Sequence, residues 1–273
     1  MDAPGGELVA LGTSAPLALK VLGPTADYVG QGLQSWTENR VNNVRAIFEI
    51  AGRKLGDKLD SPGEVPPRMV KEVLDEGSYR SDELGVEYFG GLLASSRTGT
   101  PRDDRSAALA SLVGRLSIYQ LRSHYVIYAY AQRLLAGTDV NLSLGSDRQR
   151  HARVFIPFDA WVDAMGFDTS ETLSGPEIWD HCHHGLMREQ LLNKWWMFGS
   201  GKHLTRETNR IITTEGMALE PSVLGVELFS SAHGLTGSPE ANFLDPEREF
   251  EIESSVNLLD GAALVHTLPQ AGT

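Results

Sequence analysis

The sequence predicts a mainly α-helical protein, with a multi-helix N-terminal domain followed by a winged-helix-like α+β module. Two observations predict this fold class. Through most of residues 24–137, apolar residues recur at spacings of three and four, which is the helical period. Between Lys194 and Leu219, short aromatic and β-branched segments alternate with turn residues, which is typical of strands.

A long helix is expected from Pro24 to about Leu59. Proline is favoured at the first helical position because its missing N–H would have no intrahelical acceptor there. At about 1.5 Å per residue such a helix is about 50 Å long, and its apolar stripe must be covered by the rest of the chain or by a second copy. Trp36 lies on this stripe and is therefore a candidate interaction residue.

Shorter helices complete the N-terminal domain. Ser81 is the expected N-cap of one of them, with acidic residues in its first turn. Ser117–Gln120 has the form of a capping box, so a separate helix is expected to start there. After a break at residues 61–67, the expected helices cover about residues 69–77, 81–98, 103–116 and 117–137.

The second half of the chain has the element order of a winged helix. Residues 138–152 are polar and turn-rich, so we place the domain boundary there and predict domains at 1–137 and 153–235. The expected order is a strand at 153–157, helices at 159–166 and 176–192, strands at 194–198, 210–213 and 217–219, and a helix at 222–234. Residues 199–208 are expected to form a loop. Residues 236–273 form an acidic tail, which is either an added edge strand or a segment that orders on a partner.

The charge balance argues against a general nucleic-acid binder. The 273 residues contain 24 Lys and Arg against 36 Asp and Glu, a net charge of −12. Residues 171–230 carry five basic side chains against eight acidic ones, whereas a DNA reader usually has the opposite balance. Protein docking is therefore the expected use of the module, although Lys202, Arg206 and Arg210 are candidates for one basic face of its hairpin.

Two tryptophans in the module are candidate partner contacts. In a strand, neighbouring side chains point to opposite faces, so one of Trp195 and Trp196 is expected in the core and the other at the surface. An exposed tryptophan is a common anchor in protein interfaces.

Composition also limits the cellular setting. The single cysteine, Cys182, has no partner for an internal disulfide, which favours a reducing, cytoplasmic compartment. No run of 18 apolar residues occurs, so no transmembrane helix is expected.

Two side-chain clusters are candidates for ligand chemistry. His181 and His184 would share a helix face and hold a metal if further ligands joined them, but a partly exposed polar face explains them more simply. Anion-binding candidates are Arg102, Arg105, Tyr119, Arg122 and His124, for which surface solvation and ion pairing are again the simpler explanation. The chain has neither a nucleophile-elbow motif nor a phosphate loop, so no cofactor and no catalytic residue are predicted.

An ordered set of helical segments carries a family resemblance: Leu22–Asp27, Asn43–Phe48, Pro66–Arg68, Glu83–Ser95, Leu116–Arg122 and Leu224–Phe229. Through these segments the sequence resembles the abortive-infection alpha family of bacterial phage-defence proteins over about residues 20–234. The resemblance implies a role in antiviral defence but transfers no catalytic residue.

These observations lead to three functional hypotheses. The first is a non-enzymatic defence protein that acts through protein contacts, as an oligomer, with a phage component as one possible partner. The second is a nucleic-acid or nucleotide-binding regulator that uses the arginines named above. The third is a metal-dependent hydrolase built on His181 and His184.

Overall fold

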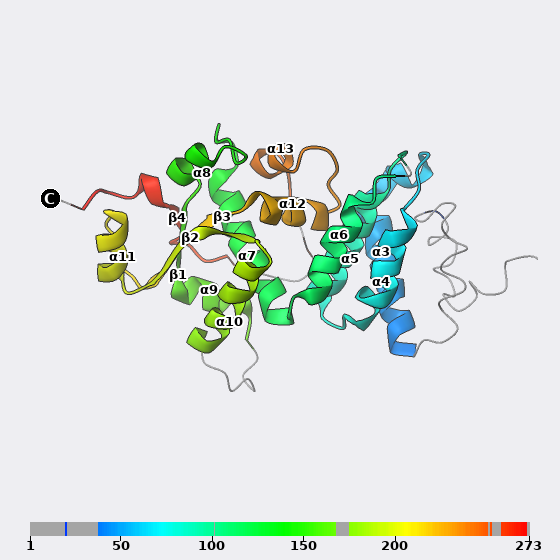
Figure 1. The fold of residues 1–273 in the computed structure, drawn as a ribbon, viewed down its shortest axis with the longest axis horizontal. Helices are drawn as coiled ribbons and strands as arrows, with labels where there is room; N and C mark the ends of the chain where they lie inside the picture. The colour runs from blue at the N-terminus through cyan, green and yellow to red at the C-terminus, as the bar shows by residue number, and fades with distance from the viewer. Residues whose placement is uncertain are drawn as a thin grey trace, which may run out of the picture. The chain divides into compact units, whose positions relative to one another are not determined.

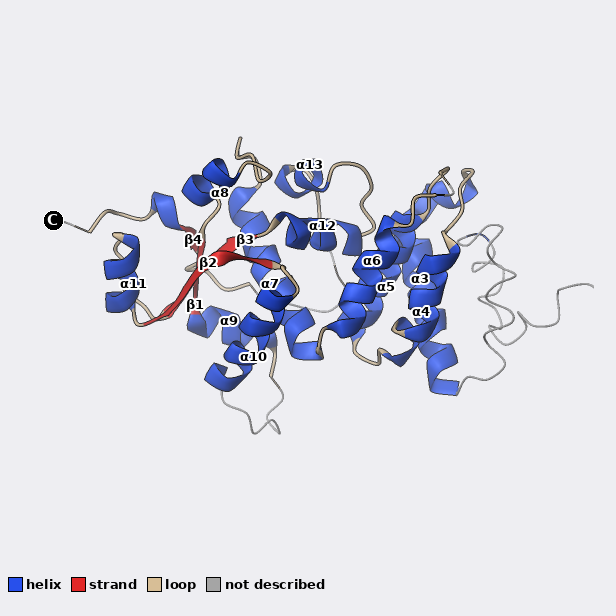
Figure 2. Ribbon diagram, viewed as in Figure 1, coloured by secondary structure: helices blue, strands red, loops and turns tan. Residues whose placement is uncertain are grey.

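The structure is a computed structural model, and it describes residues 20, 38–100, 102–167, 175–250, 252 and 258–271 (Figure 1). These residues are mainly helical, and a small antiparallel sheet lies in the C-terminal part, as the sequence predicts (Figure 2). The chain divides into two compact units. The first unit takes its described residues from Met1–Leu116, Ser230–Gly237 and Glu251–Ser254, and the second from Ser117–Phe229, Ser238–Phe250 and Ser255–Thr273.

The first unit is a helical assembly around one almost fully buried helix, α5. Its elements are α3 (Glu38–Leu55), η3 (Gly56–Asp60), α4 (Pro67–Asp75), η4 (Gly77–Tyr79), α5 (Glu83–Ser96) and α6 (Arg105–Arg115). Helix α3 is the described part of the long helix expected from the sequence. Residues 21–37, which include Trp36, lie outside the described residues.

Small residues let other segments approach α5 closely. A Cβ on Gly90 would lie 2.3 Å from Cγ2 of Ile50 on α3, and a Cβ on Gly91 would lie 1.6 Å from the carbonyl oxygen of Ala232. Only glycine fits such contacts without moving the neighbouring segment. The start of α5 differs from expectation in one detail, because Asp82 and not Ser81 is the N-cap and accepts a 2.7 Å hydrogen bond from the backbone N–H of Gly85.

The second unit combines helices with the sheet. Its sheet contains four antiparallel strands among the described residues, in the order β2-β3-β1-β4. Its elements are α7 (Ile118–Leu135), α8 (Gly145–His151), β1 (Val154–Pro157), α9 (Phe158–Met165), α10 (Gly175–Arg188), β2 (Leu192–Gly199), α11 (Gly201–Thr208), β3 (Gly216–Pro221), most of α12 (Val223–Ala232), α13 (Pro239–Leu244), β4 (Ala263–Leu264) and η5 (Val265–Thr267).

The connectivity of this unit is that of a winged helix with additions. Helix α7 is followed by β1, the helix pair α9 and α10, and the strands β2 and β3, and β3 lies between β1 and β2. Helix α7 belongs to this unit because it packs against α9, α10 and β1. The compact units therefore divide at Leu116/Ser117, whereas the predicted domain boundary lies at residues 138–152.

Helix α7 begins at a capping box, and Tyr128 ties it to the rest of the unit. The capping box of Ser117 and Gln120 is present as expected. The hydroxyl of Tyr128 donates a 2.5 Å hydrogen bond to the carbonyl of Leu191 and accepts one of 2.9 Å from the backbone N–H of Ser222. Burial raises the pKa of this phenol to about 12, so the group stays neutral and keeps its proton for Leu191.

Two parts of the sheet differ from the expectation. Residues 201–208 form α11 instead of a loop, because the side chain of Ser200 caps a helical turn by accepting from the backbone N–H of His203. Residues 210–213 form no strand beyond a single bridge between Arg210 and Gln270. The tail contributes an edge strand, β4 at Ala263–Leu264, which pairs with β1.

Within the described ranges, no helix is both long enough and apolar enough to cross a membrane.

Candidate functional site

The outward side of α10 is the first candidate surface, because the third helix of a winged helix is the one that contacts DNA when such a domain binds DNA. Here the helix contains no lysine, and its one arginine, Arg188, forms a 3.0 Å ion pair with Glu189. The exposed side chains include Asp180, His181 and His184. This surface therefore offers little positive charge to a phosphate backbone.

We call four exposed side chains the α10 face: His181 and His184 on α10, Trp196 on β2, and Ile118 at the start of α7. The ring centroids of His184 and Trp196 are 6.4 Å apart. His181 Nε2 lies 2.8 Å from the hydroxyl of Ser117, which precedes Ile118. Ile118 is 54% exposed and Trp196 is 39% exposed, so the face presents two large apolar side chains to solvent.

The alternation of β2 places its two tryptophans differently, as expected from the sequence. Trp195 is partly buried against the small core of Phe155 and Leu204, and the guanidinium of Arg153 lies 3.9 Å from the centroid of its ring. Trp196 faces the other side and its ring centroid lies 3.9 Å from that of His183.

An aromatic layer lies under the α10 face and holds Trp196 in place. The rings of Trp179 and His183 are stacked with centroids 5.1 Å apart, and Trp179 also packs edge-on against Trp161 at 5.5 Å. Trp161 is itself held by a 3.1 Å hydrogen bond from its indole N–H to the Ser123 hydroxyl. Rings fixed in this way give an exposed anchor little rotational freedom to lose on binding.

His183 is a buried polar group within this layer. It is 1% exposed, and neither ring nitrogen has a hydrogen-bond partner in the described part of the chain. Burial, with a smaller contribution from the neighbouring His184, lowers the pKa of His183 to about 4, although Asp180 acts in the opposite direction. The imidazole is therefore neutral at neutral pH.

This environment predicts a loss of stability in acid. In the folded protein His183 has a pKa of about 4, below its ordinary value of 6.5, so the unfolded chain binds the proton more readily. The contribution of neutral His183 to the free energy of unfolding is complete above pH 6.5. It declines as the pH falls toward about 4. Urea unfolding across this range should show a shallower decline for His183→Phe than for the wild type.

The exposed His181 on the same helix provides the control, and His181→Gln should retain the wild-type pH dependence. If the free energy of unfolding falls equally with pH in the wild type and in His183→Phe, His183 is not the source of the acid sensitivity.

The metal candidates His181 and His184 are both exposed on α10. Among the residues that the structure describes, no group of three or more His, Cys, Asp or Glu side chains is placed to hold a metal ion. His181 contacts the hydroxyl of Ser117, and His184 contacts the rings of His183 and Trp196.

The predicted anion-binding residues fall in both units. In the first unit, Arg102 is exposed, and Arg105 contacts both carboxylate oxygens of Asp103 at 2.8 Å. The others lie on α7 in the second unit. Arg122 donates to the carbonyl of Ala164 at 3.1 Å, the ring of Tyr119 lies 6.2 Å from that of Phe167, and His124 is fully buried with Nε2 3.3 Å from the carbonyl oxygen of Gly225. An anion site built from these residues stays a prediction.

The predicted basic residues of the hairpin lie in and after α11. Lys202 and Arg206 are exposed on that helix, and Arg206 forms a 2.9 Å ion pair with Glu207. Arg210 donates to the carbonyl of Leu268 at 3.0 Å. Arg206 is thus already paired with a carboxylate, and Arg210 is hydrogen-bonded to a backbone carbonyl.

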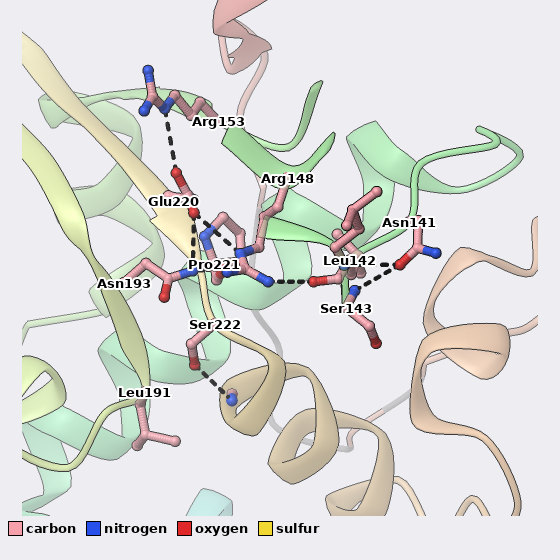
Figure 3. Close-up of polar contacts among 12 residues, drawn as sticks. Asn141, Leu142, Ser143, Arg148, Arg153, Leu191, Asn193, Glu220, Pro221 and Ser222 are labelled. Atoms are coloured by element: carbon pink, nitrogen blue, oxygen red, sulfur yellow. Dashed lines mark hydrogen bonds and ion pairs between the residues drawn. The ribbon is translucent and has the colours of Figure 1, made fainter. Parts of the chain in front are cut away.

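A buried charged centre around Glu220 was not anticipated from the sequence (Figure 3). The carboxylate lies on β3 and is 3% exposed. It accepts hydrogen bonds from Arg148 at 3.1 Å, Arg153 at 3.3 Å and Asn193 at 3.1 Å. Arg148 also donates to the carbonyl of Leu142. Through Glu220 the centre joins α8 to β2, to β3 and to the residue that precedes β1. A glutamate inside an otherwise apolar strand is the sequence signal that could have indicated it.

Comparison with known proteins adds no relative. No protein-family model matches the sequence, no curated protein matches it, and no solved structure matches the fold.

Proposed function

We propose that this chain is a cytoplasmic antiviral defence protein of the abortive-infection type that binds a protein partner through the α10 face and performs no catalysis. The observation that carries the proposal is the character of that face. It exposes Trp196 and Ile118 at the position where a DNA-binding winged helix would present cations. The resemblance to the abortive-infection alpha family supplies the biological setting.

The composition of the α10 face fits a protein interface. A large aromatic side chain at the centre, surrounded by polar groups that can exclude water, is the usual arrangement of an interface hot spot. Here the exposed indole of Trp196 is supported by His183 and flanked by His184. The supporting rings are buried, so the anchor is already arranged before a partner binds.

The rival function, nucleic-acid binding, has weaker support. The net charge of −12 repels a phosphate backbone at long range. On α11, the guanidinium of Arg206 is paired with Glu207, so acidic charge already offsets part of the positive charge of that helix. A protein partner agrees better with these charges. Self-association into an oligomer is the part of the proposal that can be tested without knowing the partner.

The proposal predicts two results with the purified full-length chain. Titration of a labelled duplex should show a dissociation constant no lower than that of non-specific contacts, about 10⁻⁴ to 10⁻⁶ M, because the net charge of −12 opposes binding to a phosphate backbone. Light scattering should give a mass of at least twice the mass of one chain, because the proposal includes self-association. Tight duplex binding that weakens steeply with added salt would favour the rival function. A strict monomer would contradict the assembly.

A further inference from the structure

A cavity of about 390 Å³ lies in the second unit, apart from the α10 face. Its walls come from the segment after α7, from α8, and from β4 and η5 of the tail. The lining residues are Thr138, Asp139, Val140, Asp147, His151, Leu264, His266 and Thr267. A volume of this order is at the lower end of the range for small-molecule sites in proteins.

The lining combines two carboxylates, two imidazoles and two aliphatic side chains. Asp147 is held in place because one carboxylate oxygen accepts a 2.6 Å hydrogen bond from the backbone N–H of Asn141. Its other oxygen lies 3.7 Å from Nε2 of His151. The rings of His151 and His266 meet edge-on with centroids 5.0 Å apart. Acidic and imidazole groups are thus fixed beside one another.

His266 adds hydrogen-bonding capacity that the described chain does not use. Its Nδ1 atom is buried and has no hydrogen-bond partner among the described residues. Burial, followed by His151 and Arg210, lowers the pKa of His266, so its imidazole is neutral at neutral pH. The His266 ring lines the cavity, so it can contact a bound group there.

The charges around the cavity favour a cation. The described lining residues include two carboxylates, Asp139 and Asp147, and neither lysine nor arginine. The nearby guanidinium of Arg210 does not line the cavity, and it donates to the carbonyl of Leu268. Val140 and Leu264 supply apolar surface for the body of a ligand.

We propose that this cavity binds a small organic cation, namely a primary amine carried on an apolar body. The ammonium donates to the carboxylates of Asp147 and Asp139, and the imidazole of His266 accepts a further N–H. The apolar body contacts Val140 and Leu264. The site is independent of the α10 face and of the function proposed for it.

Three probes of similar size test the chemical class. Calorimetric titration of the full chain at about pH 7.5 should detect benzylamine. Benzyl alcohol and benzoate should bind at least about tenfold more weakly, because neither carries a positive charge to pair with the carboxylates. Asp147→Asn retains an oxygen for the Asn141 N–H, and it should weaken benzylamine binding at least about tenfold. Asp139→Asn changes an exposed position and should also weaken benzylamine binding.

Asp159→Asn is the matched control, because Asp159 is exposed on α9 in the same unit and does not line the cavity. It should bind benzylamine as the wild type does. The proposal is overturned if benzylamine does not bind, if the three probes bind equally, or if Asp139→Asn and Asp159→Asn behave alike. The Asp139 variant keeps the test valid even if the Asp147 variant fails to fold.

Discussion

Replacing Glu220 by alanine should lower the free energy of unfolding by about 3–5 kcal/mol, the typical cost of removing one partner from a buried ion pair. The carboxylate is 3% exposed and accepts hydrogen bonds from Arg148, Arg153 and Asn193. Its removal would leave the guanidinium of Arg148, which is also mostly buried, without its counter-charge.

Chemical denaturation of the purified variant measures this effect. Glu215→Ala is the control, because Glu215 is exposed just before the same strand and its substitution should change the stability by less than about 0.5 kcal/mol. If Glu220→Ala costs no more than Glu215→Ala, the charged centre does not hold β3 to its neighbours.

Features encoded by local patterns were predictable from the sequence. The capping box at Ser117–Gln120 marks the start of α7, and the structure confirms it. The alternation of Trp195 and Trp196 across β2 follows from the strand period. The helical period likewise indicates the mainly helical first unit.

Features that depend on long-range contacts were not predictable. Residues 201–208 begin with a glycine and are mostly polar, so their composition favours a loop even though Ser200 caps a helix there. The edge strand at Ala263–Leu264 is only two residues long and is defined by its pairing with β1. A segment this short has no periodicity to detect.

The candidate sites were likewise predictable only where a local pattern encodes them. An exposed tryptophan near a hairpin was expected, but the support from His183 depends on α10 and β2 meeting in space. The cavity is formed by residues 138–151 and 264–267, which are more than a hundred positions apart in the chain. No single-sequence pattern brings such segments together.

Substitutions on the α10 face should abolish phage protection. The indole of Trp196 is 39% exposed, and interface tryptophans commonly contribute about 2 kcal/mol or more to binding, which is about a thirtyfold change in affinity. Trp196→Gln and Ile118→Gln should therefore release the partner. Leu144→Gln is a matched control, because Leu144 and Ile118 are both 54% exposed and Leu144 does not belong to the α10 face.

The central claim is tested most directly by plaque counts on cells that produce these chains at equal levels, with thermal melts confirming that each variant folds. We predict that the wild type and Leu144→Gln reduce plaque numbers for at least one phage in a panel, and that Trp196→Gln and Ile118→Gln restore them to the numbers on cells without the protein. Equal protection by all four chains would contradict the role of the α10 face, and no protection by the wild type against any phage would contradict the role in defence.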